Sequence, residues 1–150
     1  MGLKEKLLGK TVFLDTAPII YYIEGKQPIY ESVLKSIFIE NSKGNILFAT
    51  SALTLLELLV QPLRVKRFDL VEKYKTILTT SSNLKIMDLD PETSLIAANL
   101  RADYNLKTPD AIQIASSIIS GSDLFLTNDK QLSIVEEIEV LVLADETTMS

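Results

Sequence analysis

The sequence predicts an α/β fold of three layers, in which helices cover both faces of a central, mainly parallel sheet of four to five strands. Short runs of β-branched and apolar residues alternate along the chain with longer segments whose apolar residues recur at helical spacing. Glycine or proline lies at several of the junctions between them. Strands that alternate with helices favour a parallel sheet whose two faces are both covered.

The first part of the chain supplies two of the predicted strands. Thr11–Leu14 is β-branched and apolar, as expected of a strand buried on both faces, and Pro18 allows a short helix to begin after it. A second helix is predicted over Tyr30–Asn41, where apolar residues have helical spacing. A glycine stops this helix, and the strand Ile46–Ala49 follows.

Two consecutive helices come next. Ser51 suits the N-cap of a helix over Ala52–Val60, which is predicted to end at Gln61-Pro62 because proline lacks the N–H that helix bonding requires. Phe68–Thr80 has an apolar stripe and predicts another helix. Leu84–Met87 then predicts the third strand.

Two similar signatures open the helices of the second half. Asp90-Pro91-Glu92 combines an N-cap, a first-turn proline and a first-turn acid, which predicts a helix to about Tyr104. Thr108-Pro109-Asp110 repeats the signature and predicts a helix to about Ser120. The last strands are predicted at Leu124–Thr127 and Val140–Leu143.

Length and composition limit the classes of function. A chain of 150 residues with 47% hydrophobic residues predicts one globular domain over residues 1–150. The chain has no cysteine and no histidine, which excludes disulfides, thiolate metal sites and every Ser/His/Asp or Cys/His triad. Any catalysis must therefore use carboxylates, hydroxyls or lysine.

Charge and hydropathy give expectations about surroundings and partners. No signal peptide is visible in Met1–Lys10, and the apolar runs are too short to span a membrane, so we expect a soluble, cytoplasmic protein. The net charge of −5 argues against binding nucleic acid through bulk electrostatics. An RNA substrate would need metal ions or a local basic patch.

Four acids occupy positions that invite a functional interpretation, although each has a structural one. Asp15 follows a strand and could cap the next helix, whereas Glu57 interrupts an apolar stretch, where burial would be costly. Glu57 could instead form a capping box with Thr54 or face solvent. Asp110 suits the positive end of a helix dipole, and Asp129 could be a first-turn acid.

The combination of the four acids is more informative than any one of them. Asp15 and Asp129 follow strands, Asp110 begins a helix and Glu57 lies in the helix after the second strand, so all four could meet at one end of the sheet. Neighbouring carboxylates repel by roughly 1–4 kcal/mol per pair, so such a cluster needs neutralisation. Oxygen-only ligands favour Mg²⁺ or Mn²⁺.

Four segments in this order resemble the PIN domain, in particular the short VapC-type toxins of toxin–antitoxin pairs. They are FLDTAPIIYYIE, LTLLELL, LRADYNLKTPDAIQIASSI and LFLTNDKQL, and the resemblance covers nearly the whole chain. It implies a PIN-like α/β/α fold and an Mg²⁺- or Mn²⁺-dependent endoribonuclease. Departures from the usual pattern stand at Ala17, where many relatives have serine or asparagine, and at Leu132, where phenylalanine is frequent.

The resemblance also implies roles for individual residues. The catalytic and metal-binding quartet would be Asp15, Glu57, Asp110 and Asp129. Supporting positions beside the quartet would be Thr16, Thr127 and Asn128. A cognate antitoxin and a homodimer are the implied protein partners.

The densest basic stretch offers candidates for contact with substrate phosphates, although a solvated helix face would look the same. It contains Arg64, Lys66, Arg67, Lys73 and Lys75. The alternative function is a non-catalytic PIN-fold module that binds RNA or protein. A receiver domain is disfavoured because the acidic pair that it needs near the first strand is missing.

Overall fold

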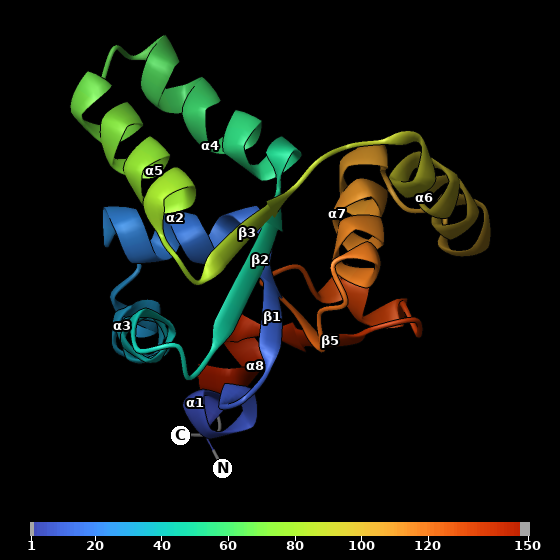
Figure 1. The fold of residues 1–150 in the computed structure, drawn as a ribbon, viewed down its shortest axis with the longest axis horizontal. Helices are drawn as coiled ribbons and strands as arrows, with labels where there is room; N and C mark the ends of the chain where they lie inside the picture. The colour runs from blue at the N-terminus through green and yellow to red at the C-terminus, as the bar shows by residue number, and fades with distance from the viewer. Residues whose placement is uncertain (1, 148–150) are drawn as a thin grey trace.

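The structure, a computed structural model that describes residues 2–147, has the predicted three layers (Figure 1). Five strands form one sheet in the order β3-β2-β1-β4-β5, and all four pairings are parallel. The strands are β1 (Thr11–Leu14), β2 (Leu47–Ser51), β3 (Leu84–Met87), β4 (Leu124–Thr127) and β5 (Glu139–Val142). The prediction of four to five mainly parallel strands is thus confirmed, with five strands and no antiparallel pair among the described residues.

The helices divide between the two faces of the sheet. The first face is covered by α1 (Leu3–Leu7), α2 (Thr16–Glu24), α3 (Pro28–Ser42), α4 (Ala52–Arg64), α5 (Phe68–Thr80) and α8 (Leu143–Thr147). The second face is covered by α6 (Pro91–Tyr104), α7 (Thr108–Ile119) and the 3₁₀ helix η1 (Lys130–Ile134).

Alternation along the strands produces the two hydrophobic cores. Val12 and Leu14 of β1 are buried in the first core, whereas Phe13 between them is buried in the second. Phe13 stacks on Phe125 of β4, with ring centroids 5.5 Å apart. Leu132 is also buried in the second core, so an aliphatic side chain fills that position.

Helix α4 is longer than predicted, because Pro62 does not end it. The helix continues to Arg64, with Pro62 buried inside it. Proline removes one intrahelical hydrogen bond, but the next turns are still closed by bonds from Val65 N to Gln61 O at 3.1 Å and from Arg67 N to Pro62 O at 2.8 Å. Burial of the proline ring and these bonds offset the lost one.

Three short helices were absent from the sequence prediction, because five residues are too few to show a helical period. These are α1, α8 and η1. The first two are tied together by an ion pair of 2.8 Å between Lys6 and Glu146. No helix among residues 2–147 has both the length and the apolar character needed to cross a bilayer.

The topology singles out one place on the sheet. The chain leaves β1 toward β2 through α2 and α3 on the first face, and it reaches β4, on the other side of β1, through α6 and α7 on the second face. The direction of winding therefore reverses between β1 and β4. In open α/β sheets, ligands bind beyond the carboxyl ends of the strands at such a switch point.

Candidate functional site

Asp15 lies at this switch point, directly after β1, and it caps α2. Its Oδ1 accepts a hydrogen bond from the backbone N–H of Thr16 at 2.8 Å. Its Oδ2 accepts one from the Thr127 hydroxyl at 2.8 Å, across from the end of β4. Asp15 is therefore the N-cap that the structural interpretation proposed, but capping uses only one of its two oxygens.

The surroundings of Asp15 disfavour its charged form. Burial raises the pKa of Asp15, while hydrogen bonds from Thr127, Thr16 and Gln113 partly oppose the rise and the negative charge of Asp129 adds to it. The net pKa is higher than that of an ordinary aspartate. A nearby cation would stabilise the ionised carboxylate.

The pKa of Asp110, in the first turn of α7, is raised by burial and by the charges of all three other acids. Burial raises its pKa first, and the charges of Asp15, Asp129 and Glu57 raise it further, whereas Lys107 lowers it. Electrostatic effects between carboxylates weaken with distance, so these contributions indicate that Asp110 lies on the side of the sheet where the other three acids lie. The four acids come from four different elements.

Glu57 is connected to the other acids by a hydrogen bond from Thr16, and its side chain is exposed. The Thr16 hydroxyl donates to Glu57 Oε1 at 3.1 Å. The expected desolvation of Glu57 is wrong, because its side chain is exposed and the apolar stretch around it is itself divided between core and solvent. Leu58 is buried, whereas Leu56 is 59% exposed. Of the two structural alternatives for Glu57, the solvent-facing position is observed and the capping box with Thr54 is absent, since Ser51 caps α4 through Thr54 N.

Asp129 is connected to Asp15 by Thr127. The Thr127 hydroxyl accepts a hydrogen bond from Asp129 N at 3.1 Å while it donates to Asp15. Asp129 Oδ1 accepts from Gln131 N at 2.9 Å and so caps η1. Asp129 is thus the N-cap of η1 and not the first-turn acid considered from the sequence, and its Oδ2 has no hydrogen bond from the described residues.

Asn128 has a different role from its neighbours. Its Nδ2 donates to the hydroxyls of Tyr21 and Tyr30, each at 3.3 Å, and its Oδ1 accepts from Ala144 N at 3.0 Å. These contacts join the end of β4 to α2, α3 and the start of α8. The side chain supports the loop that carries Asp129, and within the described residues it forms no hydrogen bond with the four acids.

The four acids do not form a complete metal site as they are arranged in the described part of the chain. Within residues 2–147, no three side chains of the ligand types are already arranged to hold one metal ion. In the same range, none of the four acids forms an ion pair with lysine or arginine. Carboxylate oxygens are the ligands that Mg²⁺ and Mn²⁺ prefer, so the chemistry of the donor set fits these ions.

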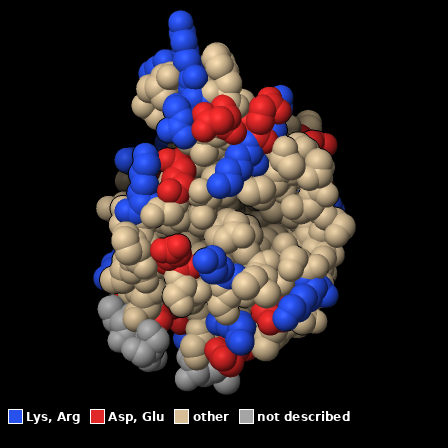
Figure 2. Space-filling view, turned by 90° about the vertical axis from the view of Figure 1, so that its left-hand side faces the viewer, with Lys and Arg blue, Asp and Glu red and all other residues tan. Residues whose placement is uncertain are grey.

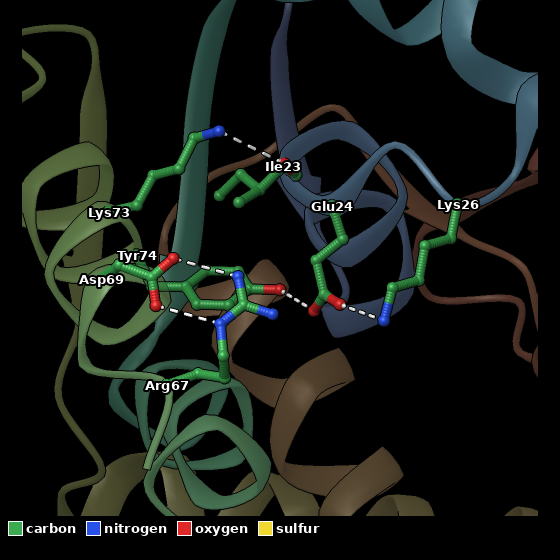
Figure 3. Close-up of polar contacts among 7 residues, drawn as sticks. All are labelled: Ile23, Glu24, Lys26, Arg67, Asp69, Lys73 and Tyr74. Carbon is green, nitrogen blue, oxygen red and sulfur yellow. Dashed lines mark hydrogen bonds and ion pairs between the residues drawn. The ribbon is translucent and has the colours of Figure 1, made fainter. Parts of the chain in front are cut away.

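The basic candidates lie away from the acids. Arg64 is seven residues beyond Glu57 on α4, or about 10 Å along the helix axis, and Lys66 lies in the connection to α5 with φ of 59°. Arg67 is occupied by Asp69, with bonds of 3.0 and 2.9 Å, and this pairing lowers the pKa of Asp69 to about 2 (Figure 3).

Basic and acidic side chains are mixed on this side of the molecule. Figure 2 shows Lys and Arg among Asp and Glu on the face seen from the left of Figure 1, without a continuous basic patch. Lys73 donates to the carbonyl of Ile23 at 3.4 Å, and Lys75 pairs with Glu72 at 3.3 Å. The local basic patch expected from the sequence is therefore partly neutralised by neighbouring groups.

Three buried polar residues lie at the site although the sequence analysis gave none of them a role there, and two of them were considered only for helix capping. They are Ser51, Thr54 and Gln113. Gln113 lies three residues after Asp110 on α7, so it shares a helix face with that acid, and this spacing was the available signal. A glutamine within an apolar helix is otherwise unremarkable in a sequence.

Comparisons with known proteins agree on the fold. The family model described as PIN domain matches residues 12–138. VapBC2 from Rickettsia felis bound to a promoter DNA fragment is 18% identical, with a TM-score of 0.68 over 88% of this chain and 98% of that chain. A toxin–antitoxin complex from Klebsiella pneumoniae is 19% identical, with a TM-score of 0.66 over 88% and 97%.

A third similar structure is the DNA-bound VapBC from Salmonella typhimurium, which is 18% identical, with a TM-score of 0.63 over 89% of this chain and 98% of that chain. No curated protein matched the sequence. At such low identities these structures establish similarity of fold alone. The family match spans most of the chain and includes all four acids, and the chain therefore belongs to the PIN domain family.

Proposed function

We propose that this protein is a divalent-metal-dependent endoribonuclease in which Asp15, Glu57, Asp110 and Asp129 bind the metal. The observation that carries the proposal is that Thr127 bonds to both Asp15 and Asp129, and Thr16 bonds to both Asp15 and Glu57, at the switch point. Beyond the effect of burial, the charges of these three acids also raise the pKa of Asp110. Negative charge gathered at a sheet edge without paired cations favours occupation by Mg²⁺ or Mn²⁺. PIN domain membership supports the nuclease assignment.

The reaction class follows from the groups at the site. The chain has no histidine and no cysteine, so neither an imidazole base nor a thiolate nucleophile is available. One or two divalent ions, when bound, would lower the pKa of the attacking water and neutralise charge on the phosphodiester. Asp15 would enter this chemistry already oriented by Thr16 N–H and the Thr127 hydroxyl.

The open carboxyl edge suits a long, negatively charged substrate more than a small molecule. An RNA strand could pass over the edge between α4 and α7, and Arg64 and Lys66, which are exposed and outside the ion pairs of residues 2–147, would contact its backbone. Arg67 is the weakest of the three candidates, because Asp69 already engages its guanidinium.

We further propose that the protein is the toxin of a toxin–antitoxin pair acting in the cytoplasm as a single domain over residues 1–150. Support comes from the similarity to two VapBC structures that were solved with DNA and to a structure named a toxin–antitoxin complex. An antitoxin or a second copy would cover the exposed apolar side chains of α4. These are Leu56, Val60 and Leu63, with exposures between 40% and 59%.

An RNA cleavage assay tests the proposal. Purified protein is incubated with cellular RNA in Mg²⁺, in Mn²⁺ and in EDTA, alongside Asp15→Asn and Asp110→Asn. Cleavage that requires a divalent ion and falls by about 100-fold or more in both variants is expected, because each loses a ligand charge. Ion binding without cleavage would favour the non-catalytic binding module, and equal cleavage by all three proteins would discard the quartet.

A further inference from the structure

Gln113 is a buried amide whose polar atoms are all engaged at the acid site. Its side chain belongs to a residue that is only 2% exposed. Nε2 donates to Thr54 Oγ1 at 2.6 Å and to Asp15 Oδ1 at 3.5 Å, and Oε1 accepts from Ser51 Oγ. A primary amide has two hydrogens and one carbonyl oxygen, so every polar position of the group has a partner.

The contacts fix which way round the amide lies. Ser51 Oγ accepts a hydrogen bond from Thr54 N at 3.2 Å, so its own hydrogen is free to be donated to Gln113 Oε1. Exchanging the oxygen and nitrogen of the amide would place Oε1 against the Asp15 carboxylate, where two acceptors repel. The observed orientation is the one that gives Asp15 a donor.

This side chain connects the elements that carry three of the acids. Gln113 lies one turn after Asp110 on α7, and its partner Thr54 lies one turn before Glu57 on α4. The same amide reaches Asp15 at the end of β1. Gln113 therefore links α7 and α4 to Asp15, the acid of the quartet to which it donates a hydrogen bond.

We propose that Gln113 is a positioning residue for metal binding, and this rests on the proposed function of the quartet. Asp15 Oδ1 accepts from both Thr16 N and Gln113 Nε2, whereas Oδ2 accepts, among residues 2–147, only from Thr127. Each carboxylate oxygen has two lone pairs, so Oδ2 retains one for a cation. Gln113 thereby directs Asp15 to bind through Oδ2.

The test compares Mn²⁺ affinity, measured by calorimetry, with thermal unfolding in EDTA. Gln113→Met keeps an unbranched side chain of similar length and removes the amide. We expect its Mn²⁺ dissociation constant to rise about 10-fold or more, the usual effect of losing a group that orients a metal ligand. Thr54→Val removes the acceptor that orients the amide and should weaken Mn²⁺ binding in the same direction, by a smaller factor.

A second buried amide supplies the matched control. Asn41 is 7% exposed, and its Nδ2 donates to Ile46 O at 2.9 Å and to Asn83 O at 3.0 Å. These carbonyls lie just before the amino ends of β2 and β3, whereas the acids lie at the carboxyl ends of the sheet. Asn41→Leu should lower the unfolding temperature while Mn²⁺ affinity stays at the wild-type value. The control therefore separates loss of stability from loss of metal positioning.

The outcomes are distinguishable. Mn²⁺ binding by Gln113→Met with wild-type affinity, whatever its stability, would overturn the role of Gln113 and leave the proposed function intact. Wild-type protein that takes up no Mn²⁺ would overturn both. If Gln113→Met does not fold, Thr54→Val decides the matter, because unchanged affinity in that variant would mean that the orientation of the amide is irrelevant to the metal.

Discussion

Thr127 Oγ1 donates a hydrogen bond of 2.8 Å to Asp15 Oδ2, and through this bond the end of β4 holds the acid that follows β1. The same oxygen accepts from the backbone of Asp129 at 3.1 Å. One fully buried hydroxyl thus sets the relative positions of two acids that are far apart in the chain. The side chain at position 127 must therefore donate to Asp15 and accept from Asp129 N at the same time.

Replacement of this hydroxyl is expected to impair the site. Thr127→Val should lower kcat for RNA cleavage by about 10- to 100-fold, because Asp15 loses an orienting donor and Asp129 N loses its acceptor. Thr127→Ser retains the hydroxyl and should stay within a few-fold of wild type. Single-turnover cleavage rates make the comparison, and equal rates for the valine and serine variants would contradict it.

The metal-free protein should gain stability when Asp110 is neutralised. The pKa of Asp110 is raised by burial and by three neighbouring acids, so the folded state binds a proton more tightly than the unfolded chain. Stability therefore falls as pH rises through the raised pKa, and it is recovered as pH drops toward 3.8, the ordinary pKa of an aspartate. Asp110→Asn in EDTA should unfold at a higher temperature than wild type at pH 7.

The difference in unfolding temperature between wild type and Asp110→Asn should shrink as the pH is lowered toward the pKa of this carboxyl in the unfolded chain. Scanning calorimetry from pH 4 to pH 7 measures it. An Asp110→Asn variant that is less stable than wild type at pH 7 would show that the acids do not repel one another in the folded state.

The stacked pair at the centre of the sheet should dominate the stability of the second core. Phe125 has no exposed surface, and its ring lies parallel to that of Phe13 within 9°. Phe125→Ala should cost about 3–5 kcal/mol of unfolding free energy, from lost burial and the cavity left behind. Urea denaturation measures the loss, and a cost below about 1 kcal/mol would be inconsistent with this packing.

The hydroxyl of Tyr74 fastens α5 to α2. It donates to Glu24 Oε2 at 2.5 Å, as Figure 3 shows, and the ring that carries it is fully buried. Burial makes the larger contribution and this hydrogen bond a smaller one to the raised pKa of Tyr74. Tyr74→Phe should destabilise the protein by about 1–2 kcal/mol, since a bond to a charged group is lost. Tyr104→Phe is the matched control, because its hydroxyl bonds to Glu137 at the surface.

The control should change the unfolding free energy by less than about 0.5 kcal/mol. Chemical denaturation of both variants in parallel decides the point. Equal losses in the two would indicate that the buried contact between α5 and α2 adds nothing beyond an ordinary surface hydrogen bond.

The parts of the fold that the sequence predicted well are those with several independent signals. The third strand and the helix that follows Asp90 both have the predicted limits. An apolar run marks the strand, and an N-cap followed by a proline marks the start of the helix, so the local signals agree. Pro62 misled the prediction, since its effect on a helix depends on whether tertiary burial offsets the lost bond. The short helices depend on contacts between the chain ends, such as Lys6 with Glu146.

The site was predictable to the level of which acids approach the switch point, but not to the level of how they are held. Asp15 and Asp129 follow strands that proved to be neighbours, and strand ends can be read from sequence. The exposure of Glu57 and the contacts of Gln113 depend on how α4 packs beside α7, which is a property of tertiary structure. Pairing of Arg67 with Asp69 is likewise a side-chain choice that sequence leaves open.

The most direct test of the account is a crystal of the wild-type protein grown with Mn²⁺, with anomalous scattering measured to locate the ion. We predict an anomalous peak within bonding distance of Asp15 and at least one more of the four acids, at the carboxyl ends of β1 and β4. Occupied manganese sites that all lie elsewhere, with these carboxylates unliganded, would contradict the account.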